Sequence, residues 1–196
     1  MSKKIKTVTV YAASSSQVGL VYYDAARKLG RLLAEHGLVC VNGAGQKGLM
    51  GVLSESVLAN GGTVCGVIPR FMIDEGWGSN TLSEVIVTET MHERKETMAR
   101  LSDACIALPG GVGTLEELLE IITWRQLGLY SKPIVILNTN NYYQDLLAMF
   151  EKAAKELFIH SKHIGIWYTA ETPEEAIKVV LEQQQWETNP RSFAAL

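Results

Sequence analysis

The residues whose types and spacing best suit reaction chemistry are 109–117, PGGVGTLEE. Three glycines lie where an apolar run, 104–108, gives way to a helical pattern that begins near Leu115. Glycine lets a ligand approach the main chain closely. The amides of a first helical turn lack acceptors within the helix and carry partial positive charge, so they suit a phosphate. Two carboxylates, Glu116 and Glu117, come directly after, and the combination predicts a reaction centre.

A purely structural interpretation of the same residues is also open. Thr114 to Glu117 matches T-x-x-E, the capping box in which the glutamate only binds the backbone amide of the threonine. An isolated T-x-x-E favours this cap, because the pattern is common at helix starts. The glycine-rich turn after an apolar strand favours a ligand site, because ligands of open α/β sheets bind at the carboxyl ends of strands.

Short apolar runs alternate with amphipathic ones along the chain, which is typical of a parallel sheet buried on both faces. The pattern predicts an α/β fold with a doubly wound, mostly parallel sheet of about seven strands and helices on both faces, in a single domain over residues 1–196. We expect strands at 8–12, 38–41, 64–68, 84–88, 104–108, 133–137 and 164–168. We expect helices at 18–36, 45–58, from a T-x-x-E cap at 90–93 to 101, and at 115–127, 142–157 and 173–183.

Two segments fall outside this alternation. Residues 69–82 hold Gly76, Trp77 and Gly78 and are expected to form a loop. Such a loop beyond a strand end either covers a site or packs its tryptophan on the surface of the body. The tail from residue 187 onward is expected to be loose.

The composition excludes several classes of function. The net charge of −3 argues against a nucleic-acid-binding surface. The start of the chain does not resemble a signal peptide, and no apolar run approaches the roughly 20 residues that span a bilayer, so we expect a cytoplasmic protein without a membrane partner. Cys40, Cys65 and Cys105 lie in apolar runs and are expected to be buried, reduced thiols. His160 and His163 lack further ligands nearby, so no metal site is expected.

The turns at 13–16, 42–48, 91–95 and 109–117 should converge, because all strand-to-helix turns of such a sheet lie along one edge. Arg94 and Lys95 fall in a first helical turn, where a cation opposes the helix dipole. A phosphate or carboxylate nearby would remove that conflict. The alternative is that both are ordinary solvated charges.

Residues 43–48, GAGQKG, match the G-x-G-x-x-G fingerprint of dinucleotide-binding folds. The match is weak, because it follows the second strand and no acidic residue stands about twenty positions further on. Arg70 stands there instead and would suit a 2′-phosphate, so an NADP-dependent enzyme stays open as a minor alternative.

The P-G-G-x-G-T-x-x-E motif stands with MHERK at 91–95, SDA at 102–104 and TWRQLG at 123–128. This combination resembles the LOG (Lonely Guy) family of cytokinin riboside 5′-monophosphate phosphoribohydrolases, formerly labelled possible lysine decarboxylases, over nearly the whole chain. GLMG at 48–51 also resembles the family's second glycine loop. The chain departs from the family pattern at Ala13, where a glycine is usual, and at NGAG in 42–45, where glycines are usually consecutive.

The resemblance implies a Rossmann-like homodimer that cleaves the N-glycosidic bond of AMP or an N6-modified AMP to free base and ribose 5-phosphate, without a cofactor. It implies that Arg94 and Glu117 are catalytic. Together with the converging turns, it places the nucleotide against Ser14, Gly43, Gly45, Met91, Lys95, Gly110, Gly111, Val112, Gly113, Thr114, Glu116 and Thr123. The apolar helix expected at 115–127 is a candidate face for the second subunit; simple burial under a neighbouring helix is the alternative.

Cleavage of this bond builds positive charge on the ribose, which an ionised Glu117 would stabilise while it orients or deprotonates water. Glu116 would accept ribose hydroxyls, and Arg94 would fix the nucleotide and keep Glu117 ionised by lowering its pKa. A nucleotide-binding or sensing module without turnover is the rival hypothesis. Decarboxylation is disfavoured. A pyridoxal-phosphate enzyme needs a Schiff-base lysine, and the only candidate near the glycine turn, Lys95, would lie where the phosphate is expected.

Overall fold

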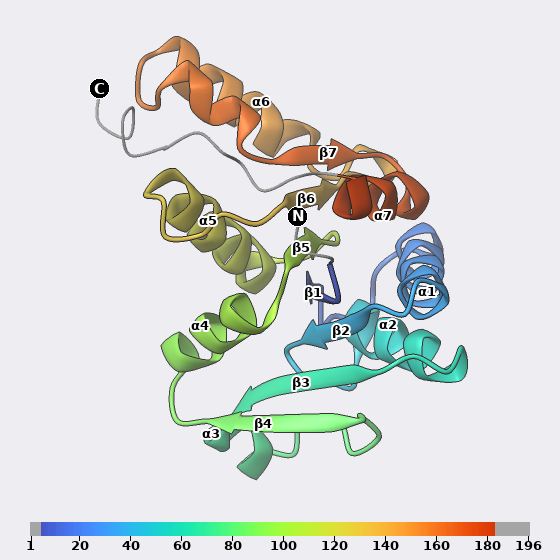
Figure 1. Ribbon diagram of the computed structural model, residues 1–196. Helices are drawn as coiled ribbons and strands as arrows, with labels where there is room; N and C mark the ends of the chain where they lie inside the picture. Colours follow the sequence, from blue (N-terminus) through green and yellow to red (C-terminus); the bar gives the residue numbers. More distant parts are fainter. Residues whose placement is uncertain (1–4, 183–196) are drawn as a thin grey trace.

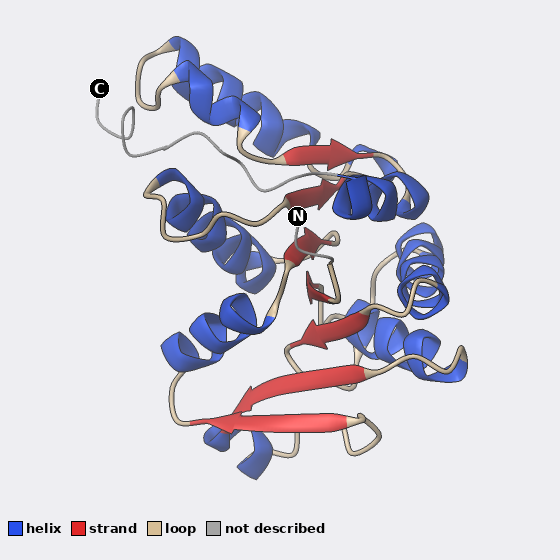
Figure 2. Cartoon of the chain, viewed as in Figure 1, coloured by secondary structure: helices blue, strands red, loops and turns tan. Residues whose placement is uncertain are grey.

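The computed structural model describes residues 5–182 and shows a seven-stranded sheet with helices on both faces (Figures 1 and 2). Every pair of neighbouring strands is parallel, and the order is β4-β3-β2-β1-β5-β6-β7. The strands are β1 (Thr7–Tyr11), β2 (Val39–Asn42), β3 (Val64–Pro69), β4 (Glu84–Thr88), β5 (Ala104–Ala107), β6 (Ile134–Leu137) and β7 (Tyr168–Ala170).

Three helices pack on each face of the sheet (Figure 1). One face carries α1 (Leu20–Glu35), α2 (Gly48–Ala59) and α7 (Pro173–Glu182), and the other carries α4 (Met91–Leu101), α5 (Val112–Gln126) and α6 (Gln144–Lys155). A short helix, α3 (Arg70–Asp74), follows β3, and two 3₁₀ turns, η1 (Thr139–Asn141) and η2 (Ser161–Gly165), flank α6. The doubly wound fold expected from the sequence is confirmed.

The strand order reverses between β1 and β5, which lie side by side with Val10 opposite Ile106 and Tyr11 opposite Ala107. From this pair the chain runs outward to β4 in its first half and to β7 in its second half. Connections therefore leave β1 and β5 toward opposite faces, and a crevice opens beyond their carboxyl ends. Ligands of open α/β sheets bind at this switch point.

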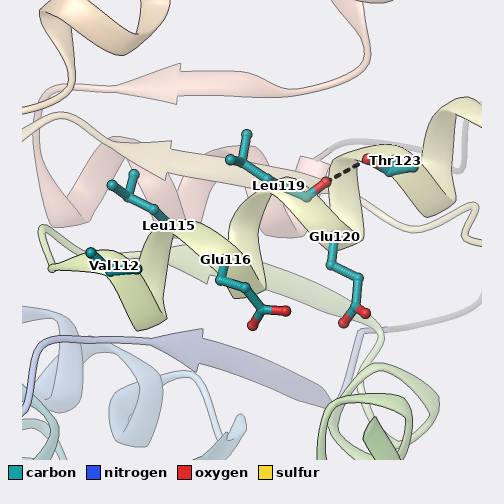
Figure 3. A pocket seen from close by; sticks show the side chains of 6 residues that line it. All are labelled: Val112, Leu115, Glu116, Leu119, Glu120 and Thr123. Atoms are coloured by element: carbon teal, nitrogen blue, oxygen red, sulfur yellow. Dashed lines mark hydrogen bonds between the residues drawn. The ribbon is translucent and has the colours of Figure 1, made fainter.

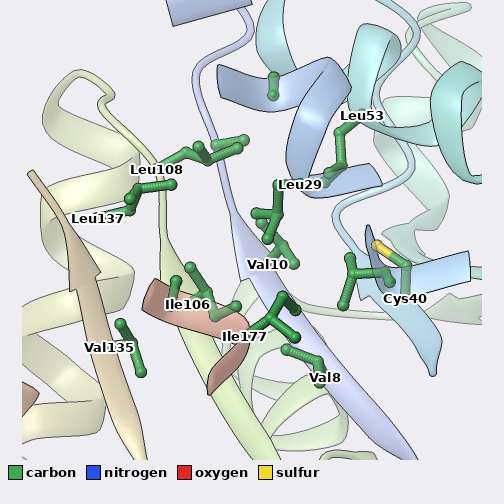
Figure 4. Packing of buried hydrophobic residues seen from close by; sticks show 14 of the residues in the cluster. Val8, Val10, Leu29, Cys40, Leu53, Ile106, Leu108, Val135, Leu137 and Ile177 are labelled. Atoms are coloured by element: carbon green, nitrogen blue, oxygen red, sulfur yellow. The ribbon is translucent and has the colours of Figure 1, made fainter. Parts of the chain in front are cut away.

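Two apolar clusters, one on each face, hold the helices to the sheet. Val8 and Val10 of β1 point toward α1 and pack with Leu29, Ile106 and other residues shown in Figure 4. Tyr11 belongs to the cluster on the opposite face, since successive strand side chains alternate between faces. Burial of each large apolar side chain contributes about 1.5–3 kcal/mol, so both faces fix the carboxyl edge of the sheet firmly.

Three sequence expectations are wrong in detail. The run 164–168 is not the seventh strand: η2 occupies its start, and β7 begins only at Tyr168. Ile166 and Trp167 are buried against α6 without entering the sheet, so their apolar character reflects packing rather than pairing. The segment 69–82 is not all loop, because it contains α3. The helix after the glycine turn begins at Val112, before the expected residue 115.

The three cysteines are buried and free, as expected. Burial raises the pKa of the Cys40 and Cys105 thiols to about 12 and that of Cys65 to about 11, so they behave as small apolar groups. Among residues 5–182, no helix is long and apolar enough to cross a membrane. The tail from residue 187 lies outside the described residues.

Candidate active site

A cavity of about 680 Å³ opens at the carboxyl ends of the central strands. Turns after β1, β2, β3 and β5 and the start of α4 converge on it, as the topology predicts. Its lining comprises Ala12, Ala13, Ser14, Ser15, Gly43, Gly45, Gln46, Lys47, Met50, Ile68, Met72, Gly76, Trp77, Met91, Arg94, Gly111, Val112, Gly113, Thr114, Glu116 and Glu117.

An ion pair between Arg94 of α4 and Glu117 of α5 lies in this cavity, with Arg94 Nη1 3.3 Å from Glu117 Oε1. The two side chains are only 7% and 10% exposed. Arg94 Nε also donates to the carbonyl of Val67 at 3.0 Å, and Nη2 donates to the carbonyl of Gly43 at 3.3 Å. The guanidinium is thereby fixed by β3 and the turn after β2 as well as by Glu117.

Gly43 is needed at its position because of this arginine. A Cβ atom there would lie 1.7 Å from Arg94 Nη2, far inside van der Waals contact. The turn after β2 thus makes room for the guanidinium. In the G-x-G-x-x-G fingerprint, by contrast, the glycines let a pyrophosphate approach the main chain. Arg70, the residue on which the NADP interpretation depends, is exposed on α3 and is not part of the cavity lining.

The pKa of Glu117 is raised to about 7. Burial disfavours its charged form and raises the pKa; the positive charge of Arg94 lowers it by less. The expectation that Arg94 lowers the pKa of this carboxyl is right in direction. The expected net result is wrong, because burial raises the pKa by more than the arginine lowers it. A carboxyl with a pKa near neutrality can both release and accept a proton at physiological pH.

The first turn of α5 faces the cavity with its backbone amides. Gly111 is the N-cap, its carbonyl accepts from the amide of Leu115 at 3.0 Å, and within the described chain no side chain caps this helix. The amides of Val112, Gly113 and Thr114 accordingly have no acceptor inside the helix. These residues line the cavity, so the partial positive charge of the helix start faces the ligand space.

The capping-box interpretation of Thr114 to Glu117 is wrong. Thr114 is the third residue of α5 rather than its N-cap, and Glu117 contacts Arg94 of another helix rather than the Thr114 amide. The glutamate that resembles a cap is a buried acid of the cavity.

Lys95 lies beside the cavity and contacts an acidic pair on α5, of which Glu116 lines the cavity. Its Nζ contacts Glu116 Oε1 and lies 3.0 Å from Glu120 Oε1. Burial alone would lower the pKa of Lys95, but the hydrogen bonds and charges of the two glutamates outweigh it and raise the pKa. Figure 3 shows Glu116 and Glu120 on one side of α5 and Leu115 and Leu119 on the other. Lys95 therefore links α4 to α5 beside the cavity.

The structure brings most of the sequence-predicted site residues together. Three of them, Lys95, Gly110 and Thr123, do not line the cavity. Gly110 packs against Thr114, whose Oγ1 a Cβ at residue 110 would meet at 2.2 Å. Thr123 donates to the carbonyl of Leu119 at 2.8 Å and lines a separate groove on the outer side of α5 (Figure 3). Direct contact of these three with a nucleotide stays a prediction.

The apolar wall of the cavity was missed from the sequence. Ile68, Met72 and Trp77 come from the end of β3 and the segment behind it, and Met50 comes from α2. The sequence signal was the tryptophan-bearing excursion at 69–82, whose two alternatives the pattern left open. The structure favours the first alternative, because this segment forms a side of the cavity.

Main-chain contacts hold the excursion in place. The amide of Ser79 donates to the carbonyl of Ala44 at 2.8 Å, and Gly45 and Gly78 form an antiparallel bridge. The Gln46 side chain adds a hydrogen bond to the carbonyl of Gly76 at 3.1 Å. The segment after β3 is thus joined to the turn after β2, and residues of both segments line the cavity. Within residues 5–182, no group of three or more histidine, cysteine or acidic side chains is placed to hold a metal ion.

The fold and this site define a class: an α/β protein with a cavity of about 680 Å³ at the switch point, an uncapped helix start beside it and a buried arginine–carboxylate pair. A protein family model described as "Possible lysine decarboxylase" matches residues 50–180. The chain belongs to this family, which confirms the LOG resemblance of the sequence motifs.

Two plant relatives show how similar the members are. A probable cytokinin riboside 5′-monophosphate phosphoribohydrolase of Oryza sativa subsp. japonica, LOGL2, is 40% identical over 98% of this chain and 83% of the rice protein. The cytokinin riboside 5′-monophosphate phosphoribohydrolase LOG5 of Arabidopsis thaliana is 44% identical over 91% of this chain and 78% of its own length.

Solved structures agree with the architecture. The X-ray structure of TM1055 covers 90% of this chain and 98% of its own, at 26% identity and a TM-score of 0.70. The molybdenum cofactor carrier protein of Chlamydomonas reinhardtii covers 90% of this chain and 96% of its own, at 22% identity and a TM-score of 0.69. The second likeness is one of fold alone.

Proposed function

We propose that this protein is a nucleoside 5′-monophosphate phosphoribohydrolase that hydrolyses AMP carrying an N6 substituent, of the cytokinin riboside monophosphate type, to free base and ribose 5-phosphate. The observation that carries the proposal is the buried Arg94–Glu117 pair beside the uncapped start of α5 in one cavity. The names of the plant relatives support the same reaction. The whole chain acts as one nucleotide-binding domain.

The phosphate of the substrate lies on the amides of residues 111–114, which places the ribose toward Glu117. As the bond from C1′ to the base nitrogen breaks, its electrons leave with the base and positive charge grows on the sugar. Glu117 in its ionised form stabilises that charge and takes a proton from the attacking water, whose oxygen bonds to C1′. The proton then leaves with the base. Arg94 holds the carboxylate in place and offers a positive charge to the nucleotide.

The base lies against the apolar wall of Ile68, Met72 and Trp77. Trp77 is 53% exposed and Phe71 packs edge-on against it, with ring centroids 6.5 Å apart. Aromatic faces stack on any nucleobase, and apolar side chains take an aliphatic chain in preference to an unsubstituted amino group. This wall therefore supports an N6-alkylated base as the preferred leaving group, and Trp77→Ala should reduce the preference for N6-alkyl AMP over AMP.

The description of the family as a decarboxylase fits this site poorly. A Schiff-base lysine must be deprotonated to attack a carbonyl, whereas the two glutamates that contact Lys95 favour its charged form. Lys95 also lies outside the cavity lining.

The protein acts as a homodimer in the cytoplasm under this proposal. The outer side of α5 supports the dimer: Val112 is 84% exposed, and Leu119 and Leu127 are each exposed by more than a third. A groove between Val112 and Thr123 runs along the same side. Light scattering should give twice the mass of the 21.6 kDa chain, and a monomeric mass would contradict the dimer.

The test of the reaction is to incubate the purified protein with AMP, N6-isopentenyl-AMP, GMP and CMP and to separate products by chromatography. Release of adenine and of the N6-substituted base with one equivalent of ribose 5-phosphate is expected, fastest for the substituted nucleotide. Tight binding of these nucleotides without any free base would instead support the rival hypothesis of a binding or sensing module.

A further inference from the structure

Two tyrosines at the start of α6 hold the backbone of the turn after β5. The hydroxyl of Tyr142 donates to the carbonyl of Gly110 at 2.7 Å, and the hydroxyl of Tyr143 donates to the carbonyl of Leu108 at 2.7 Å. The turn between β5 and α5 is thus hydrogen-bonded to a segment some thirty residues further along the chain. Neither tyrosine belongs to the cavity lining.

The hydrogen bond of Tyr142 fixes the direction of one amide in the cavity. In a trans peptide the carbonyl of one residue and the N–H of the next point to opposite sides. The carbonyl of Gly110 points to Tyr142, so the N–H of Gly111 points the other way. Gly111 lines the cavity at the start of α5, where the phosphate is expected.

The bond of Tyr143 does not aim an amide in this way. Its acceptor, the Leu108 carbonyl, precedes Pro109, which has no N–H. Tyr143 is also fully buried, with 1% exposure, and belongs to the apolar cluster on the α6 side. Its role is to anchor the chain, so it serves as a natural comparison for Tyr142.

The Gly110–Gly111 peptide needs such a hold more than other peptides do. Both flanking residues are glycines, which allow the peptide plane to rotate into conformations that a side chain would forbid. Without the tyrosine hydroxyl, the Gly110–Gly111 peptide would sample orientations in which its carbonyl oxygen points toward the phosphate. The partial negative charge of that oxygen repels the phosphate.

The backbone directly before Tyr142 is strained. Asn140 and Asn141, directly before it, have φ angles of 54° and 56°, in the left-handed region that asparagine tolerates better than most residues. The side chain of Asn138 accepts from the amide of Tyr143 at 2.7 Å, and the Tyr142 ring packs edge-on against Tyr22 of α1, with centroids 5.8 Å apart. The tyrosine is therefore held in position before any ligand arrives.

We infer that Tyr142 is a positioning residue for the phosphate of the substrate: it aims the Gly111 amide from behind the turn. The inference rests on the proposed function, because it assumes that a phosphate docks on the start of α5. It assigns to a residue about thirty positions beyond the glycine motif a share of the selectivity for phosphorylated ligands.

The test compares Tyr142→Phe with the wild-type protein by calorimetry, using ribose 5-phosphate and adenosine as separate ligands, and by kinetics with AMP. We expect the variant to bind ribose 5-phosphate about five- to tenfold more weakly, as for one lost hydrogen bond, with a matching rise in KM. Affinity for adenosine and kcat should each change less than about twofold, because only the phosphate contact is affected.

Two controls separate positioning from general damage. Tyr143→Phe should lower the melting temperature while the ratio of the two affinities stays that of the wild type. Tyr23→Phe, on α1, removes a hydroxyl from a ring that packs on the core and should change neither. Equal losses for adenosine and ribose 5-phosphate in Tyr142→Phe, or no loss at all, would overturn the inference. A wild-type protein that binds no ribose 5-phosphate would contradict the proposed function itself.

Discussion

The starts of α4 and α5 carry the same four-residue pattern and use it in opposite ways. At α4, Thr90 is the N-cap: its Oγ1 accepts from the amide of Glu93 at 3.1 Å, and Glu93 accepts from the amide of Glu89 at 2.8 Å. At α5, the helix begins three residues earlier relative to the pattern, and Glu117 reaches Arg94. The N-cap is a glycine there, so the amides stay available.

The comparison shows one helix start whose first amides are satisfied by its own side chains and another, beside the cavity, that has no side-chain cap. The start of α7 is capped in the same way as that of α4. Thr172 Oγ1 accepts from the amide of Glu175, and the Glu175 side chain accepts from the amide of Glu171. The open start lies at the switch point of the sheet, where a ligand can supply the missing acceptors. With glycine at the N-cap, the open start costs only about a few tenths of a kcal/mol of stability, which a bound anion can restore.

The largest difference between the two patterns should appear when each glutamate becomes an amide. Glu117→Gln is expected to lower kcat by about 10²–10⁴-fold, because it removes the acid–base group and the negative charge, while AMP still binds. Glu93→Gln makes the same change at the capping box and should leave kcat unchanged. Steady-state kinetics with AMP compares them. Equal kcat values in the two variants would remove Glu117 from the mechanism.

The second largest effect concerns stability against pH. The raised pKa of Glu117 means that between about pH 4.5 and 7 the folded state holds a proton that the unfolded state has lost. Unfolding free energy should therefore fall as pH rises through this window, by about 3 kcal/mol at most, at about 1.4 kcal/mol per pKa unit. Denaturant unfolding at several pH values should show the fall in the wild type relative to Glu117→Gln. Parallel pH curves for the two proteins would contradict it.

Activity should change with pH in the opposite direction. The proposed reaction needs ionised Glu117, so kcat/KM should rise with pH and level off above about 7. The protein is then most active in the pH range where its buried carboxylate destabilises it most. A profile that is flat from pH 5 to 8 would argue against an essential carboxylate of raised pKa.

A smaller effect is expected when the open helix start is given a cap. Gly111 has a φ of −82°, and a Cβ there meets no atom within 4 Å, so Gly111→Asp fits the fold. The new carboxylate should stabilise α5 by about 0.5 kcal/mol and weaken binding of ribose 5-phosphate by roughly tenfold or more, since it competes for the same amides. Calorimetry and thermal unfolding measure the two changes. A gain in both stability and affinity would show that the phosphate docks elsewhere.

The smallest effect is that of removing a cap that already exists. Thr90→Ala should lower the free energy of unfolding by about 1 kcal/mol, because the Glu93 amide loses its acceptor. Its kinetic constants should stay close to those of the wild type, in contrast to the changes at α5. A large loss of activity would mean that the start of α4 also serves the reaction, through Arg94.

Much of the fold follows from local patterns, because strands buried on both faces leave continuous apolar runs. The predictions fail where side chains are buried without pairing in the sheet: in the run at 164–168, Ile166 and Trp167 are buried as core contacts after a 3₁₀ turn. The early start of α5 escaped prediction because its N-cap, Gly111, carries no polar side chain to mark it.

The site was predictable only in part. The motif and the topology placed Arg94 and Glu117 together, because both follow strand ends at the same edge of the sheet. The pKa of Glu117 was not predictable, since it depends on how much protein surrounds the carboxyl rather than on its neighbours in sequence. The contribution of Met72 and Trp77 depends on the contacts between 76–79 and 44–46, which join segments some thirty residues apart.

Those contacts have a consequence for how the ligand preference of this protein can evolve. Because the bridge between Gly45 and Gly78 and the bond from Ser79 to Ala44 use main-chain atoms, they do not depend on which side chains the segment carries. Mutations at Phe71, Met72 and Trp77 can thus accumulate without displacing the buried Arg94–Glu117 pair. One family can in this way diversify the molecules it accepts while it inherits an unaltered reaction.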